Sequence, residues 1–340
     1  MKKSVLSLLI ALMAIVVANA QQISVVSEGT TSLYRTLQEA IENAPDGSVI
    51  YLPGGQFAIS DEVKITKKLT IIGIGHYLST ESSEDGFTKI EGNLWFNENS
   101  SGSSVMACYI TGDVNIGDDN ASVNNIVIKF CNLNSVQVKN ESIRGTYVNQ
   151  NYVRSYCDFS NSSCSIYNNV IHSIRNVREG YIYYNIICNS RGGRDNDLSL
   201  CDIESSVIFY NILKGRGLSG NYYGFWDPFR GNDCATWQNL VVGDHYGKTF
   251  GDNPIIIDAQ GSECFVSVGN GYSWWNISSN SDYHFKEEYK QYESQIGIYA
   301  GSGFSDKQLA PVPFIVDHRV DSETDASGKL NIHIRVKASE

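Results

Sequence analysis

The chain has 340 residues, of which 42% are hydrophobic and 19% are charged, and its formal net charge at pH 7 is −11. A surface this acidic repels nucleic acid and anionic lipid, so we expect neither as a partner. Polyuronate chains meet the same repulsion unless local basic patches or bound cations reverse the field.

The N-terminus has the pattern of a signal peptide. Lys2 and Lys3 precede an apolar run over residues 5–17, and Ala18-Asn19-Ala20 supplies the small residues at which signal peptidases cut. We predict that the mature chain starts near Gln21 and is secreted, to the periplasm, the cell surface or the extracellular medium. No later segment has the eighteen or so apolar residues that a membrane helix needs, so no membrane insertion is expected.

An amphipathic helix is predicted over residues 33–44, because its apolar residues share one face: Leu33, Leu37, Ala40, Ile41 and Ala44. Pro45-Asp46-Gly47 ends this helix. Residues 49–52 and 69–73 follow as strands, separated by the turn at Pro53-Gly54-Gly55. A helix laid across the first coil of a repetitive β fold would protect its apolar end, so we expect an N-terminal cap.

An internal repeat dominates the middle of the chain. An asparagine recurs before an apolar pair or near-pair at six places: Asn132, Asn151, Asn169, Asn185, Asn211 and Asn239. Two positions before five of these asparagines stand aromatic residues: Phe130, Tyr167, Tyr183, Phe209 and Trp237. The position after each asparagine is apolar. A turn residue and a core residue therefore share one period, which is typical of stacked coils.

The repeat predicts an all-β protein with a right-handed parallel β-helix. In such a fold no coil buries its apolar face alone, so like side chains stack on like side chains. Asparagine suits the tight turn because it tolerates the left-handed conformation, and its amide can bond along a stacked ladder. We predict a signal peptide at 1–20, a β-helix domain at 21–310 and a C-terminal β-hairpin at 311–340.

The hairpin is predicted from strict alternation of polar and apolar residues over 329–337, which Phe314-Ile315-Val316 can pair with across a polar loop. We expect it to pack on the last coil, and a sorting or docking tail is the alternative. The chain also has eight cysteines. Export permits disulfides, and Cys157 and Cys164 are close enough in sequence to close a small loop, while buried apolar thiols are the alternative.

Both ends of the predicted coils resemble the pectin-lyase-like superfamily of β-helices. The opening resemblance lies in TLQEAI at 36–41, GSVIYLPGG at 47–55 and KLTIIG at 68–73. The closing segments are similar to the last coils of secreted bacterial members: DNPIIID at 252–258, SDYHF at 281–285 and SQIGIYAG at 294–301. The resemblance covers about residues 30–305 and implies the fold. It implies no single activity, because the superfamily includes lyases, hydrolases, esterases and binding or scaffold proteins.

The catalytic signatures of that superfamily are largely missing. Gly117-Asp118-Asp119 resembles the first part of the polygalacturonase-like signature, but no Gly-His-Gly and no Arg-x-Lys follows, so we interpret it as a solvated turn. Asp317-His318-Arg319 resembles a lyase tripeptide but lies in the predicted hairpin, where we treat it as a coincidence. The pectinesterase-like set of one glutamine and two aspartates is not found.

Two long intervals of the repeat place their extra residues after the apolar pair, so two insertions should leave one face on successive coils. The first, at 189–197, carries charged residues: Arg191, Arg194, Asp195 and Asp197. The second, at 214–230, carries aromatic and charged residues: Tyr222, Tyr223, Trp226, Asp227 and Arg230. Aromatic rings pack against sugar rings, and Arg and Asp bond their hydroxyls, so this face is typical of carbohydrate recognition. Arg175 and Arg178, on the same turn of a shorter coil, either extend the site or only contact solvent.

We assign catalysis to Asp195, Asp197, Asp227, Arg194 and Arg230, because a buried carboxyl can hold a proton and arginine stabilises developing charge. Substrate binding is assigned to Arg191, Tyr222, Tyr223, Trp226 and His245. Ordinary loops whose aromatics pack on the coil beneath are the alternative. Asp195-Asn196-Asp197 offers oxygen ligands for calcium but supplies only three of the six to eight that calcium takes. No metal site and no cofactor is therefore predicted.

Two functions remain open at this point. One is an enzyme of polysaccharide degradation, either a lyase or a glycoside hydrolase. The other is a non-catalytic carbohydrate-binding protein or a cell-surface scaffold or adhesive. The missing signatures favour the second, and the charge concentrated on the two insertions favours the first. We expect a polysaccharide as partner, a neutral glycan rather than a polyuronate, and a monomer.

Overall fold

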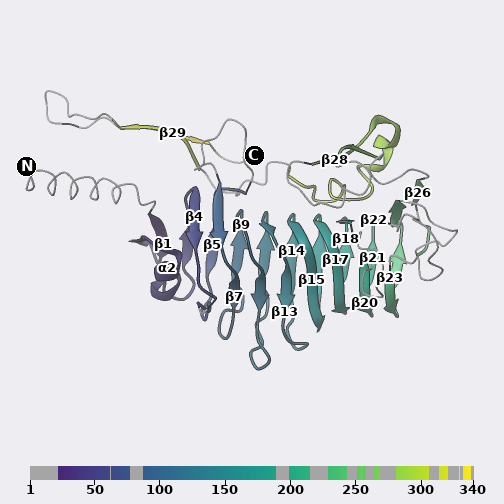
Figure 1. Cartoon of the computed structure of the whole chain (residues 1–340), viewed down its shortest axis with the longest axis horizontal. Coiled ribbons are helices and arrows are strands. Elements are labelled where there is room, and N and C mark those ends of the chain that lie inside the picture. The colour runs from purple at the N-terminus through teal and green to yellow at the C-terminus, as the bar shows by residue number, and fades with distance from the viewer. Residues whose placement is uncertain are drawn as a thin grey trace, which may run out of the picture.

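The computed structural model describes residues 22–61, 63–76, 87–188, 199–214, 229–242, 251–253, 255–257, 264–268, 281–305, 314–320, 329 and 332–337. Within these residues the chain is mostly β-structure, wound as stacked coils along one axis (Figure 1). Two long sheets, of 11 and 15 strands, run along that axis, and nearly all of their strands pair in parallel. The predicted parallel β-helix is confirmed.

The 11-stranded sheet, here called sheet A, takes one short strand from each coil. Its order is β2 (Thr30–Tyr34), β1 (Ile23–Ser27), β3 (Val49–Tyr51), β5 (Thr70–Ile72), β8 (Ser104–Met106), β11 (Val127–Lys129), β14 (Thr146–Asn149), β16 (Cys164–Tyr167), β18 (Tyr181–Tyr183), β21 (Val207–Phe209) and β24 (Ala235–Trp237). Only β1 pairs antiparallel, with β2 and with β3.

The 15-stranded sheet, here called sheet B, has two rows. The first row is β4 (Gly55–Ala58), β6 (Thr88–Glu91), β9 (Tyr109–Ile110), β12 (Asn132–Leu133), β15 (Tyr152–Ser162), β17 (Val170–Arg178), β19 (Ile186–Ile187), β22 (Ile212–Lys214), β25 (Leu240–Val242) and β26 (Ile255–Ile257). The second row is β7 (Leu94–Phe96), β10 (Val114–Ile116), β13 (Val136–Val138), the later halves of β15 and β17, β20 (Leu200–Glu204) and β23 (Phe229–Asn232). The long strands β15 and β17 therefore join the two rows.

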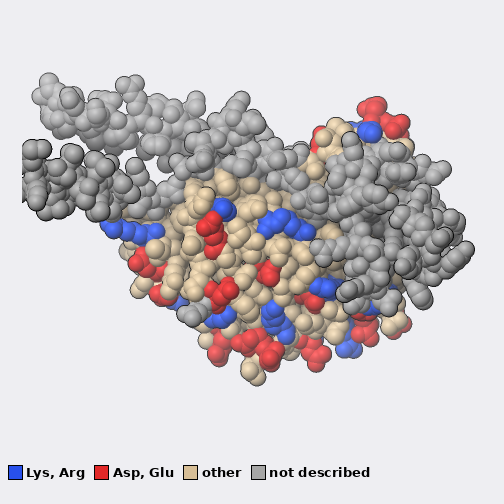
Figure 2. Space-filling view, viewed as in Figure 1, with Lys and Arg blue, Asp and Glu red and all other residues tan. Residues whose placement is uncertain are grey.

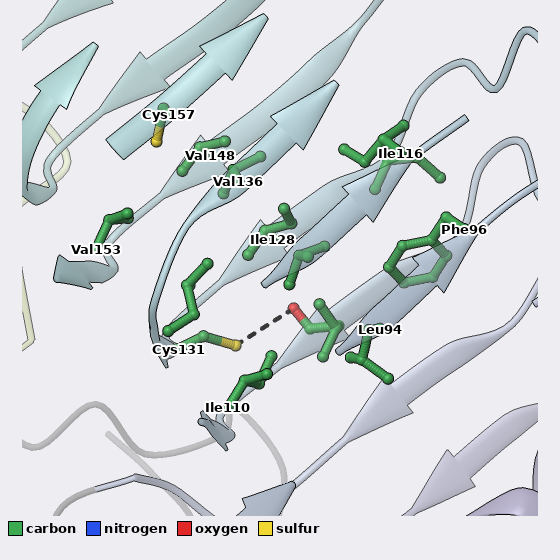
Figure 3. Packing of buried hydrophobic residues seen from close by; sticks show 14 of the residues in the cluster. Leu94, Phe96, Ile110, Ile116, Ile128, Cys131, Val136, Val148, Val153 and Cys157 are labelled. Carbon is green, nitrogen blue, oxygen red and sulfur yellow. Dashed lines mark hydrogen bonds between the residues drawn. The ribbon is translucent and has the colours of Figure 1, made fainter. Parts of the chain in front are cut away.

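A continuous apolar core fills the space inside the coils. Strand residues alternate between inner and outer positions, as in β7, where Leu94 and Phe96 are fully buried and Trp95 is not. Figure 3 shows inner side chains of neighbouring coils stacked in columns, with the Cys131 thiol directed at the carbonyl of Val105. Apolar residues recur at one period because each coil buries its inner face against the next.

The asparagines of the repeat form a buried ladder. Each Nδ2 donates to the Oδ1 of the asparagine on the next coil at 3.0 Å, in the order Asn151, Asn169, Asn185, Asn211 and Asn239. The same Oδ1 accepts the backbone N–H of the preceding asparagine at 2.8–3.0 Å. All five residues are 0% exposed, so the ladder satisfies polar groups that water does not reach.

Two expectations about this ladder are wrong. Asn132 pairs with Tyr152, so the ladder position in that coil belongs to Cys131, whose backbone N–H donates to Asn151 Oδ1. The left-handed residue is not the asparagine but the residue before it, such as Tyr184 with φ of 56°. The asparagine instead fastens the turn, because its Nδ2 donates to the carbonyl two residues earlier, as Asn185 does to Tyr183.

The aromatic residues of the repeat stack along the outer face of sheet A. Tyr167, Tyr183, Phe209 and Trp237 follow one another with ring centroids 4.9, 5.1 and 4.8 Å apart and planes within 5° of parallel. Four of the five predicted aromatics therefore share one column. Phe130 does not, because Lys129 occupies the equivalent position in its coil. This is the same one-residue offset that removes Asn132 from the ladder.

All eight cysteines are free thiols, and only Cys234 is partly exposed. The small disulfide loop between Cys157 and Cys164 is not formed, and the alternative of buried apolar thiols is confirmed. Burial raises the pKa of the Cys131 thiol to about 12 and that of Cys108 well above its usual value. The reactive thiolate form is therefore suppressed inside the coils.

The predicted N-terminal helix is α2 (Leu37–Asn43), which lies at the N-terminal end of the coils (Figure 1). Thr36 starts it through a capping box, because its side chain accepts the N–H of Glu39 and the Glu39 carboxylate accepts the N–H of Thr36. Leu33, expected on the buried face, lies instead in β2 and is 56% exposed. Leu37 and the other buried helix residues belong to the main core cluster.

Residues 281–305 do not form a further coil, contrary to expectation. After β27 (Phe265–Ser267), β28 (Asp282–Phe285) pairs antiparallel with it, and η2 (Glu287–Tyr292) follows. The rest runs back along the outside, where the Asn168 amide donates to the carbonyls of Ile298 and Ala300. This closing segment packs on an outward-facing apolar column of sheet B: Tyr152, Val170, Ile186, Ile212 and Leu240.

The predicted C-terminal hairpin is present as β29 (Phe314–Val320) paired antiparallel with β30 (Ile332–Lys337). Figure 1 draws β29 and β26 at opposite ends of the long axis, so the hairpin does not lie on the last coil. The predicted signal peptide lies outside the described residues. Among the residues that are described, no helix is long and apolar enough to cross a membrane.

Candidate functional site

The two predicted insertions leave the coils from stacked positions. The first joins β19 to β20, and the second joins β22 to β23. Ile187 pairs with Leu213 at one end of the insertions, and Leu200 pairs with Phe229 at the other. Neighbouring strands lie about 4.8 Å apart, so the two loops start and end beside each other. We call this edge, between Ile187 and Leu200 and between Leu213 and Phe229, the insertion corner.

Most predicted site residues lie outside the described residues. They are Arg191, Arg194, Asp195, Asp197, Tyr222, Tyr223, Trp226, Asp227 and His245. The structure describes the tenth, Arg230, which follows the second insertion in β23.

Arg230 is held by an acid that the sequence analysis missed. Its Nε and Nη2 donate to the two carboxylate oxygens of Asp202 at 2.7 and 2.6 Å, and Nη2 also lies 2.9 Å from Cys201 Sγ. These bonds from Arg230 hold the pKa of Asp202 below its usual value. Asp202 therefore remains a carboxylate and neutralises Arg230, which leaves less charge for a substrate than the sequence predicts.

Arg230 ends an in-register row on the outer face of sheet B. The row, which we call the polar strip, is Trp95, Asn115, Gln137, Asp158, Arg175, Cys201 and Arg230. Figure 2 shows positive and negative side chains interspersed over the described face of the molecule, with several acidic ones together along its lower rim. The strip itself contains Asp158, Arg175 and Arg230 among uncharged residues, so it is a mixed polar surface rather than a field of one sign.

Asp158 and Arg175 form the centre of the strip, and Tyr156 lies beside them. The guanidinium of Arg175 lies 3.6 Å from the centroid of the Tyr156 ring, and its Nε is 3.2 Å from Asp158 Oδ2. The Arg175 and Asp158 side chains are 29% and 26% exposed, so they are partly desolvated yet reachable from solvent. Asn176 also donates to Asp158 at 2.9 Å. A fixed ion pair beside an aromatic ring can bond the hydroxyls of a sugar.

Arg154 lies at the position equivalent to the insertion corner, in a coil that has no insertion. Its Nη1 donates to Asn132 Oδ1 at 2.8 Å, and its Nη2 donates to the carbonyls of Ile110 and Thr111 at 2.9 and 3.0 Å. Its guanidinium lies 4.8 Å from the centroid of the Tyr109 ring. Burial lowers the pKa of Arg154. In the described part of the chain no carboxylate pairs with Arg154, and its guanidinium instead donates to three oxygens of the protein.

Asp113 lies two residues after Thr111, whose carbonyl accepts from Arg154, and its carboxylate already accepts three hydrogen bonds. One of its oxygens accepts Asn134 Nδ2 at 2.7 Å and Ser135 Oγ at 2.6 Å. The other accepts Gln137 Nε2 at 2.7 Å. Both oxygens of this carboxylate accept hydrogen bonds from the coil, so its role is to hold the strip together.

The remaining sequence candidates have structural roles. Asp118 accepts the backbone N–H groups of Asn120 and Ala121 and Asp119 is exposed, which confirms the interpretation of Gly117-Asp118-Asp119 as a turn. Arg178 pairs with Glu204 at 3.6 Å, both about half-exposed. The residues that the structure describes contain no group of three or more His, Cys, Asp or Glu placed to hold a metal ion.

Sequence reasoning missed Tyr156 and Asp158, although a signal for them is present. Over β15 the buried residues Cys157 and Phe159 alternate with Tyr156 and Asp158 at the period of a strand. The repeat search aligned asparagines and did not extend to the strand that follows them.

A parallel β-helix with a polar outer strip and two stacked insertions is the class of protein that the fold defines. Residues 17–203, more than half of the chain, match the family described as rhamnogalacturonase A/epimerase, pectate lyase-like. The chain belongs to this family, which confirms the resemblance to pectin-lyase-like proteins. No curated protein and no solved structure matches the chain.

Proposed function

We propose that this protein binds an extracellular polysaccharide at the insertion corner and along the adjoining polar strip. The family description supports a polysaccharide, because rhamnogalacturonase and pectate lyase both act on polysaccharides. The charge of −11 favours a neutral glycan over a polyuronate. The predicted signal peptide supports an exported location, which N-terminal sequencing of the secreted chain would test.

The observation that carries the proposal is the stacking of the insertion roots. Because Ile187 pairs with Leu213 and Leu200 pairs with Phe229, the charged first loop and the aromatic second loop leave from one corner. Tyr222, Tyr223 and Trp226 would pack against sugar rings, while Arg191 and His245 would bond hydroxyls. The strip continues this surface through Arg175 and its neighbours.

In the enzymatic form of the proposal, the loop acids cleave the bound chain. A glycoside hydrolase needs two carboxyls, one to protonate the leaving oxygen and one to activate water or attack the sugar. Asp195, Asp197 and Asp227 are the candidates for these roles, and Arg194 would stabilise developing charge. Arg230 would contribute through its pair with Asp202, which fixes its guanidinium at the end of the strip.

A non-catalytic binding protein or surface scaffold is the second candidate. It is favoured by the state of the acids in the described strip, because Asp113, Asp158 and Asp202 are each occupied by several donors. These donors fix the carboxylates in place, so they can position the hydroxyls of a ligand without chemistry. This form of the proposal uses the same aromatic residues for adhesion without chemistry.

The test measures retention and product release on neutral and acidic polysaccharides, with and without calcium. Wild type is compared with the double variant Trp226→Ala, Asp227→Ala. A matched control removes one exposed aromatic and one exposed acid elsewhere, Tyr147→Ala with Glu141→Ala. New reducing ends or unsaturated products that are lost only in the first variant support the enzyme. Retention without turnover, lost in that same variant, supports the binding protein. Equal behaviour of all three proteins overturns the insertion corner as the site.

A further inference from the structure

A second polar hollow lies on three other coils, away from the insertion corner. It follows the C-terminal ends of β7 and β10 and has a volume of about 550 Å³, within the range of ligand pockets. Its lining is rich in amides, hydroxyls and charges, and includes Lys64, Asn97, Glu98, Asn99, Asp118 and Asn120. We call it the lysine pocket.

The lysine pocket is separate from the insertion corner and lies near the other end of the polar strip, which begins at Trp95 in β7. In the second row of sheet B, β10 and β20 are four strands apart, which corresponds to about 19 Å along the axis. The pocket also lies at the opposite ends of these strands. The insertions immediately precede the first residues of β20 and β23. The pocket residues Asn97 and Asp118, in contrast, come just after the last residues of β7 and β10. One sugar unit cannot occupy both places.

Lys64 is held over the face of Trp95. Its Nζ lies 3.4 Å from the ring centroid, and it makes no ion pair or hydrogen bond among the described residues. Burial lowers the pKa of Lys64, which a fully solvated lysine does not show. Trp95 is not part of the lining, so its ring supports the lysine from beneath.

The opposite wall supplies a positioned acceptor. Asp118 is fixed by Asn97 Nδ2 at 3.0 Å and by the backbone N–H groups of Asn120 and Ala121 at 2.9 and 2.8 Å. These bonds hold the pKa of Asp118 below its usual value, so it stays a carboxylate. The amides of Asn99 and Asn120 are exposed at the rim. Donors from Lys64 and the amides thus face an acceptor from Asp118.

We propose that the lysine pocket binds one unit of a neutral saccharide. Each hydroxyl of a sugar both donates and accepts, so it needs donors and acceptors side by side, which this lining provides. Glu98 and Asp118 outweigh the single charge of Lys64, so a uronate carboxylate would be repelled. The pocket is therefore a second carbohydrate site, independent of the insertion corner.

The experiment is a titration of the purified protein with three neutral probes, cellotriose, mannotriose and rhamnose, and with trigalacturonate as the acidic comparison. Binding is followed by calorimetry and by ligand-observed NMR. We expect at least one neutral probe to bind more tightly than trigalacturonate. Lys64→Gln and Asn97→Ala should each weaken its binding at least tenfold. The matched control is Lys129→Gln, which also removes a lysine held over an aromatic ring, Phe130, but on sheet A.

The outcomes separate this site from the insertion corner. The double variant Trp226→Ala, Asp227→Ala should leave binding of the neutral probe unchanged. If that variant abolishes binding and Lys64→Gln does not, the probe binds at the insertion corner and the lysine pocket is wrong. If no neutral probe binds, or if trigalacturonate binds more tightly than all of them, the inference is overturned whatever the polysaccharide assay shows. Circular dichroism of each variant checks folding, and Asn97→Ala decides if Lys64→Gln does not fold.

Discussion

Replacing Asn185 with alanine would break the asparagine ladder at its centre. The Asn185 Nδ2 donates to the carbonyls of Ile166 and Tyr183 and to Asn211 Oδ1, at 2.8, 3.0 and 3.0 Å. Its Oδ1 accepts the backbone N–H and the Nδ2 of Asn169, both at 3.0 Å. Because Asn185 is 0% exposed, water cannot replace these bonds without opening the coil.

The loss in the free energy of unfolding depends on which groups lose their hydrogen-bond partners. The backbone N–H of Asn169 is left buried without its acceptor, which costs about 1–3 kcal/mol, and each other lost bond costs about 0.5–1.5 kcal/mol. Bonds in one network are only partly additive. We therefore expect the free energy of unfolding to fall by about 3–6 kcal/mol, a large share of the roughly 5–15 kcal/mol typical of folded proteins.

Urea unfolding followed by circular dichroism measures this loss. Asn232→Ala is the matched control, because Asn232 is an exposed asparagine at the end of β23, and its replacement should change stability by less than about 0.5 kcal/mol. A loss in Asn185→Ala no greater than in this control would show that the ladder is incidental to the fold.

Three further predictions follow from the packing. Burial disfavours the phenolate of Tyr183 and raises its pKa to about 12, so the stability that this residue contributes is complete below about pH 10 and is lost as the pH rises towards 12. In an ultraviolet titration, Tyr183→Phe should show one fewer late-titrating tyrosine than wild type. Equal late amplitudes in the two proteins would contradict this. Thiol labelling should modify only Cys234 readily in the native protein and all eight cysteines in denaturant without reductant; any shortfall in denaturant would indicate a disulfide. Phe285→Ala should cost about 3–5 kcal/mol in urea unfolding, because Phe285 is a residue of the closing segment that is 3% exposed in its apolar cluster, and a cost under about 1 kcal/mol would mean that this segment is not packed as described.

The coils could be predicted because their signal repeats. From Asn151 to Asn239 the turn amide and the inner apolar residue recur in register, and from Tyr167 to Trp237 the outer aromatic does too, since each must stack on its own kind. Asn132 was aligned wrongly because it sits beside the true ladder residue, Cys131. A thiol there donates to the carbonyl of Lys129, two residues earlier, as the asparagines do in later coils. Residue type alone does not reveal that equivalence.

The closing segment could not be predicted as a cover for the outer face. Ile296 and Ile298 alternate with other residues as a coil strand would, and both are buried. What they bury against is the outer column of sheet B, at residues such as Ile186 and Ile212, which lie far away in sequence. Local periodicity specifies that a side chain is buried but not which surface buries it.

The candidate site was predicted only in part. The insertions and their common corner follow from repeat spacing, and the paired roots agree with that expectation. The pair between Arg230 and Asp202 could not be foreseen, because it depends on the strand register across a 28-residue interval. Tyr156, Asp158 and Arg175 were likewise assembled by register between β15 and β17.

The most direct test of the central claim is a crystal structure of the protein with an oligosaccharide from whichever polysaccharide it retains. Our account predicts sugar density in contact with the rings of Tyr222, Tyr223 or Trp226 at the insertion corner and extending along the polar strip. Sugar bound on another face, with these aromatic side chains packed onto the coil beneath them, would contradict the account.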